Sequence, residues 1–83
     1  MIMDNTEERL VKVFGTVFPD LTVDQIRAAT QASVATWDSV AAITLMNVME
    51  EEFAIEIDFD RAAELSSFQE ILGYIREAVG ASA

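Results

Sequence analysis

The sequence has no cysteine and no histidine among its 83 residues. Without cysteine there is neither a disulfide framework nor a thiolate nucleophile, which is compatible with the reducing cytosol. Without histidine a serine lacks its usual general base, and transition metals lack their commonest side-chain ligand. The only lysine, Lys12, falls among exposed positions of the first predicted helix. We therefore expect no enzyme activity, no catalytic residues and no metal site.

Basic residues are also few, with 5 Lys and Arg against 15 Asp and Glu and a formal charge of −10. Nucleic acid is not expected as a partner, because phosphate binding needs a basic surface. Residues 28–60 contain no Lys or Arg, and their acids are Asp38, Glu50, Glu51, Glu52, Glu56, Asp58 and Asp60. This stretch is either a solvated face that keeps the protein soluble or a surface that attracts basic protein partners.

Long hydrophobic runs are missing. No apolar stretch is long enough to span a membrane, and residues 1–8 lack the basic region and apolar run of a signal peptide. We expect a cytoplasmic protein without membrane contact. A chain this short is expected to form one domain, residues 1–83, and to be a monomer with a small core and no room for a deep cleft.

The apolar residues that are present recur at helical spacing. A first helix is expected from Asp4, which has capping-box spacing to Glu7, to about Phe18, because the single proline follows. Residues 19–38 form a long connection, in which the capping box 22–25 predicts a short helical turn over 26–29. The residues expected to pack this connection onto the core are Val23, Ile26, Val34 and Trp37.

A second helix is expected to begin at Asp38 or Ser39. Its predicted buried stripe is Ala42, Leu45, Met46, Met49 and Phe53. Its predicted exposed face carries Val40, Thr44, Asn47 and Glu51. Ile55 and Ile57 alternate with a glutamate, which predicts an extended segment after the helix.

A short third helix, capped by Asp58 or Asp60, is expected to reach Leu65. The last helix is predicted to begin with the capping box 66–69, to end at Gly80 and to leave 81–83 as a frayed tail. Its predicted stripe is Phe68, Ile71, Leu72, Ile75 and Val79. These elements predict an all-α four-helix bundle, with three longer helices, one short helix and a long loop between the first two.

Ser39 places a hydroxyl group at a helix N-terminus. In the ordinary interpretation Asp38 and Ser39 only cap the helix. Three features favour a further role: the free N–H groups and positive dipole end suit a phosphodiester on the serine oxygen, Val40 is apolar on a solvent face, and the helix runs into an acidic cluster. We interpret Ser39 as the attachment point of a long cofactor arm.

Three motifs resemble those of acyl carrier proteins and the related peptidyl carriers. They are Asp38-Ser39-Val40, the run Met49-Glu50-Glu51-Glu52-Phe53, and Ile55-Glu56-Ile57. The family pattern is Asp-Ser-Leu, then an apolar residue, two acids, any residue and Phe, and then Ile-x-Ile. The resemblance covers residues 4–79 and includes the order of the helices. It implies the carrier-protein type of helical bundle.

The resemblance also implies a cofactor and partners. Ser39 would receive 4′-phosphopantetheine from coenzyme A through a Mg²⁺-dependent phosphopantetheinyl transferase, and Asp38 would help position the serine. The terminal thiol would hold acyl groups as thioesters for acyl-loading and acyl-transfer enzymes with basic docking patches. Partner-docking positions match Val40, Glu50 and Glu51, and Thr44 and Asn47 share the exposed helix face. Core or acyl-pocket positions match Leu45, Met49, Phe53 and Ile57.

Several positions depart from the fatty-acid type of carrier. Thr36 stands where glycine is usual, Trp37 precedes the aspartate, Val40 replaces leucine, and Ala41 and Thr44 stand where acids are frequent. These departures leave the cargo open among fatty-acid, polyketide and related pathways, and a peptidyl or aminoacyl carrier remains an alternative. Two further alternatives are an unmodified acidic interaction module in which Ser39 is only a cap, and an acidic adaptor or antagonist of a basic partner.

Overall fold

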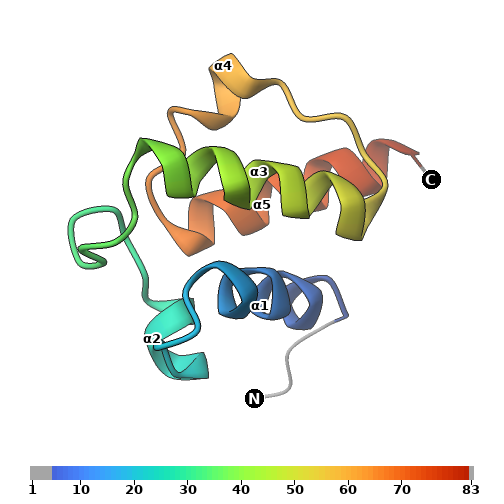
Figure 1. Ribbon diagram of the computed structural model, residues 1–83. Coiled ribbons are helices and arrows are strands. Elements are labelled where there is room, and N and C mark those ends of the chain that lie inside the picture. The colour runs from blue at the N-terminus through green and yellow to red at the C-terminus, as the bar shows by residue number, and fades with distance from the viewer. Residues whose placement is uncertain (1–4, 83) are drawn as a thin grey trace.

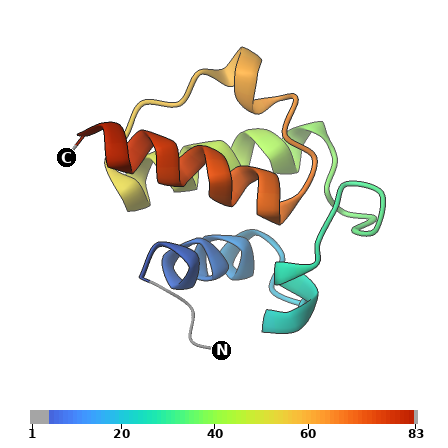
Figure 2. The same ribbon diagram turned by 180° about the vertical axis from the view of Figure 1, so that it is seen from behind.

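The computed structural model describes residues 5–82, which form five helices and no strand. The helices are α1 (Asn5–Val17), α2 (Val23–Arg27), α3 (Ser39–Phe53), α4 (Phe59–Ala62) and α5 (Phe68–Ser82). In Figures 1 and 2, α3 and α5 run side by side, α1 lies beneath both, and α4 covers the opposite side. The predicted all-α bundle is confirmed. The described residues contain two short helices, α2 and α4, whereas the predicted bundle had one.

The three longer helices bury the apolar stripes that their spacing predicted. Four members of the α3 stripe are buried and Ala42 is half-buried, while the opposite face is exposed as predicted. The α5 stripe is buried except for Val79, which is partly covered. In α1 the innermost residues are Leu10 and Phe14, neither of which is exposed at all. Since α1 packs against both α3 and α5, these side chains form the centre of the core.

The predicted capping box between Asp4 and Glu7 at the start of α1 stays a prediction. Asp4 lies outside the described residues, and Glu7 is buried, where its carboxylate accepts a hydrogen bond from Arg27 Nε at 2.9 Å. This ion pair joins α1 to α2. At the other end the helix stops at Val17, and Phe18 N still donates to the Phe14 carbonyl at 2.7 Å, as expected before proline.

The predicted capping box in the long connection is confirmed. Gln25 N donates to Thr22 Oγ1 at 3.2 Å, and Thr22 N donates to Gln25 Oε1 at 2.9 Å. The helix it starts ends at Arg27, before the predicted end. Ile26 is buried as expected, but Val23 is 48% exposed, so its predicted packing is wrong. This helix is little more than one turn at the edge of the bundle, and Ile26 is its one buried residue.

The second half of the connection is tied to the start of α5. Gln31 N donates to the Ser66 carbonyl, and Phe68 N donates to the Ala29 carbonyl, each at 2.9 Å. These bonds form an isolated antiparallel bridge between Thr30 and Ser67. Val34 and Trp37, further along the connection, are buried as predicted. The segment before α3 is therefore fixed both by backbone hydrogen bonds and by core packing.

The two last helices begin close to their predicted positions, with two corrections. Asp58 caps α4, and its Oδ1 accepts from Asp60 N at 3.1 Å. The helix ends at Ala62 and does not reach Leu65, because residues 61–65 tighten into turns in which Leu65 N donates to the Ala62 carbonyl. The box before α5 lies one residue later than predicted, since Glu70 N donates to Ser67 Oγ at 3.1 Å.

The predicted end of α5 is also wrong. The helix continues through residue 80 to Ser82, so residues 81 and 82 are helical, and Ala83 lies outside the described residues. A glycine ends a helix by adopting a left-handed conformation, and among the described residues no glycine has a positive φ. Without that conformation Gly80 is simply a helical residue.

Alanine occupies the left-handed position that ends α3. Ala54 has φ 52° and ψ 46°, a conformation in which a Cβ is unfavourable. We expect Ala54→Gly to raise the free energy of unfolding by about 0.5–1 kcal/mol, measured by urea denaturation. The matched control is Ala28→Gly at the end of α2, where φ is −98° and glycine is expected to lower stability. Equal effects of the two variants would contradict the prediction.

Candidate functional site

Ser39 is the first residue of α3, and its side chain is exposed. The residue that caps the helix is Asp38, whose backbone is extended and whose Oδ1 accepts from Ala41 N at 2.8 Å. The Ser39 hydroxyl has no hydrogen-bond partner among residues 5–82. Asp38 alone therefore caps the helix, and the Ser39 hydroxyl is exposed without taking part in the cap.

The backbone around Ser39 also presents donors. The first bond of the helical ladder runs from Ala42 N to the Asp38 carbonyl at 2.9 Å. The N–H groups of Ser39 and Val40 precede this bond and lie outside the ladder. They are at the positive end of a 15-residue helix, so a negatively charged group attached to Ser39 would lie in a favourable field.

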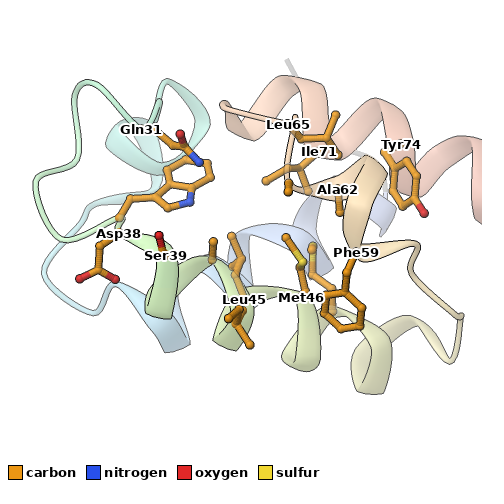
Figure 3. Close-up of a pocket in the computed structure, with 15 residues that line it drawn as sticks. Gln31, Asp38, Ser39, Leu45, Met46, Phe59, Ala62, Leu65, Ile71 and Tyr74 are labelled. Atoms are coloured by element: carbon orange, nitrogen blue, oxygen red, sulfur yellow. The ribbon is translucent and has the colours of Figure 1, made fainter.

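A cavity of about 750 Å³ lies beside Ser39, between α3 on one side and α4 and the start of α5 on the other. Figure 3 shows Gln31, Asp38 and Ser39 at one end of the cavity, and Phe59 and Tyr74 at the other. Its inner wall is apolar and includes Leu45, Met46, Met49, Ala62, Leu65 and Ile71. The sequence predicted no room for a deep cleft, but α4 and residues 63–65 form a second wall opposite α3 and leave this cavity between them.

The predicted core or acyl-pocket residues divide into two pairs. Leu45 and Met49 are buried and line the cavity. Phe53 and Ile57 are also buried, but neither lines the cavity, and the Phe53 ring instead lies 4.7 Å from the Arg9 guanidinium carbon. The opposite wall, from Leu65 to Tyr74, was not predicted as part of a site. Among the cavity-lining residues of this wall, helical spacing predicted burial only for Ile71, and only the packing of the helices shows which side chains border the cavity.

The predicted docking residues lie on α3, mostly on its outer face. Val40 is 73% exposed, and Thr44, Asn47 and Glu51 are exposed as well. Glu50 differs, because it is half-buried and its carboxylate accepts from Ile57 N at 3.1 Å. Its carboxylate therefore holds the extended segment after the helix. Ile43 and Phe59 were not predicted as site residues. They are 55% and 44% exposed, and both line the cavity.

The acidic residues do not gather into a metal or carboxylate site. Glu51 points to solvent, while Glu52 accepts from Arg9 Nε at 2.8 Å, so the acids of the run face different directions. Among residues 5–82 no group of three or more Asp and Glu side chains is arranged to hold a metal ion. No helix in the described part of the chain is long and apolar enough to cross a membrane.

The fold and the site define a small helical protein with an exposed serine hydroxyl at a helix N-terminus beside an apolar cavity. Residues 37–75 match the family described as phosphopantetheine attachment site. The chain is 35% identical over 80 residues to the acyl carrier protein of Thermosynechococcus vestitus, and the alignment covers 93% of this chain and 99% of that protein. No solved structure matches the chain. The chain belongs to the acyl carrier protein family.

Membership of this family means a covalently attached 4′-phosphopantetheine group. The residues present fit such a group. They supply an exposed hydroxyl without an internal hydrogen bond, unpaired backbone N–H groups that could face a phosphate, and an apolar cavity next to Ser39. A buried donor, Trp37 Nε1, has no partner within residues 5–82 and belongs to a residue that lines the same cavity. The carrier role implies interaction with a phosphopantetheinyl transferase and with acyl-handling enzymes.

Proposed function

We propose that Ser39 carries the phosphopantetheine arm and that the protein delivers acyl intermediates as thioesters in fatty-acid, polyketide or related biosynthesis. The observation that carries this proposal is the exposed Ser39 hydroxyl. It takes no part in capping the helix, because Asp38 accepts the hydrogen bond from Ala41 N. When bound, the group supplies a terminal thiol on a long flexible arm, and that thiol forms the thioester.

The chain's own residues prepare the attachment step. Ser39 Oγ forms a bond to the phosphorus next to the pantetheine, its proton leaves, and the pyrophosphate bond of coenzyme A breaks to release adenosine 3′,5′-bisphosphate. Asp38 is held against Ala41 N and keeps the turn before Ser39 in one conformation. The free N–H groups of Ser39 and Val40 then lie beside the new phosphodiester, an arrangement that stabilises negative charge.

The cavity favours acyl cargo over aminoacyl cargo. Its wall is lined by methionine, leucine and isoleucine side chains, and burying each methylene group is favourable by about 0.8 kcal/mol. A charged amino group would lose its hydration against this wall, and Asp38, the one acid that lines the cavity, already accepts a hydrogen bond from Ala41 N. We infer that the loaded protein takes a medium-length acyl chain between α3 and the start of α5.

The exposed face of α3 is the proposed docking surface for partner enzymes. It combines the apolar Val40 and Ile43 with Glu51, and no basic residue lies between positions 28 and 60. Such a surface suits partners with a basic patch around an apolar contact, in interfaces small enough to release the carrier after each transfer. Ala41 and Thr44, where acids are frequent in fatty-acid carriers, favour a specialised partner set.

The proposal is tested by loading the protein from coenzyme A, acetyl-coenzyme A and octanoyl-coenzyme A with Mg²⁺ and a broad-specificity transferase. Intact mass is expected to rise by one arm, and fragmentation is expected to place it on Ser39. The octanoyl form should unfold at a temperature higher by about 5 °C than the acetyl form, because only the longer chain fills the cavity. Equal unfolding temperatures would favour the peptidyl or aminoacyl alternative. No added mass on folded protein would favour the unmodified interaction module.

A further inference from the structure

Trp37 is a buried residue with an unused hydrogen-bond donor. Its side chain is 5% exposed. Its ring packs edge-on against Phe14, with ring centroids 5.5 Å apart, and lies tilted against Phe18 at 5.9 Å. Its backbone N–H donates to the Val34 carbonyl at 3.0 Å. Nε1 has no hydrogen-bond partner among the residues that the structure describes. Nearly all buried donors in native proteins have a hydrogen-bond partner. We therefore expect the partner of Trp37 Nε1 to come from outside the folded chain.

The position of Trp37 indicates what that partner is. The residue lines the same cavity as Ser39 and precedes it by two positions in the chain. Tyr74, at the far end of the cavity, already accepts a hydrogen bond from Asp58 N at 3.2 Å, and the wall between the two ends is apolar. The residue that carries the free donor therefore lies at the end of the cavity where a chain attached to Ser39 would enter.

We propose that Trp37 Nε1–H donates a hydrogen bond to a carbonyl oxygen of the chain carried on Ser39, which makes Trp37 a positioning residue for the cargo. This inference rests on the proposed function. The indole nitrogen is a donor only, so its partner must be an acceptor. A neutral carbonyl satisfied by one donor can be buried, whereas a phosphate would lose its hydration and belongs at the exposed helix end.

Two carbonyl sources share this chemistry: the amides of the arm and the acyl group of the cargo. Either one would orient the chain so that its alkyl part follows Leu45 and Met49 into the apolar wall. The cavity then selects acyl cargo by polarity as well as by size. It accommodates cargo that has a hydrogen-bond acceptor near Ser39 and methylene groups further along. A phenylalanine at position 37 would supply the packing but not the donor.

The chain contains a single tryptophan, so its indole N–H gives one signal in a nitrogen–proton correlation spectrum. We would record it for the unmodified protein, the arm-bearing thiol form and the octanoyl form, each verified by intact mass, with Ser39→Ala given the same treatment as the control. The indole proton is expected to move downfield and to exchange more slowly with solvent. A change on arm attachment assigns the bond to an arm amide, and a change only on acylation assigns it to the acyl carbonyl.

An indole signal that stays the same in fully loaded protein would overturn the inference while the mass upholds the carrier function. Failure to gain mass would overturn both. A second readout is the rate of thioester cleavage by hydroxylamine in octanoyl protein. Trp37→Phe is expected to raise this rate about three- to ten-fold, because the loss of one hydrogen bond shifts the chain out of the cavity. The matched control, Phe18→Leu, alters the same aromatic cluster outside the cavity and should cleave like the wild type.

Discussion

Ser39→Ala is expected to abolish attachment of the arm completely and to change the free energy of unfolding by no more than about 0.5 kcal/mol. The hydroxyl has no hydrogen bond to lose among the described residues, and alanine is compatible with the helical backbone of residue 39. Intact mass after treatment with coenzyme A and a transferase measures the first effect, and urea denaturation measures the second.

Two control variants sharpen this result. Ser66→Ala removes another exposed serine and should leave attachment unchanged. Asp38→Ala keeps the hydroxyl but removes the cap on Ala41 N, so it should cost about 1 kcal/mol of stability. If Ser39→Ala still gained the mass of the arm, attachment would lie on a different hydroxyl. If it unfolded the protein, the serine would be a structural residue.

The start of α3 was predictable from the sequence, but which of Asp38 and Ser39 caps it was not. The spacing of apolar residues placed a helix start at Asp38 or Ser39, because a buried stripe begins immediately afterwards. Which of the two side chains turns back to the helix amides depends on the backbone angles of residue 38, which are φ −103° and ψ −172°. Sequence spacing carries no such information. The same limit explains the one-residue error at Ser67 and the wrong helix end at Gly80.

The cavity shows a second limit of sequence patterns. Periodicity predicted that Leu45, Met49 and Ile71 point inward, and all three are buried. Whether inward-pointing residues touch or leave a cavity depends on the distance between α3 and α5. That distance is set by α1, which packs beneath both helices, and by residues 59–65, which form the opposite wall of the cavity (Figure 1). A stripe of buried residues therefore predicts a core but not the cavity within it.

Trp37→Ala is expected to lower the free energy of unfolding by about 3–5 kcal/mol, a large share of the stability of a small domain. The indole fills the space beside Phe14 and Phe18 and anchors the long connection that leads into α3. Trp37→Phe should cost far less, about 1 kcal/mol, because it keeps an aromatic ring there and removes the unpaired donor. Urea unfolding followed by far-ultraviolet circular dichroism compares the variants without relying on the lost fluorophore. A small loss for Trp37→Ala would mean that the bridge between Thr30 and Ser67, and not the indole, holds the connection in place.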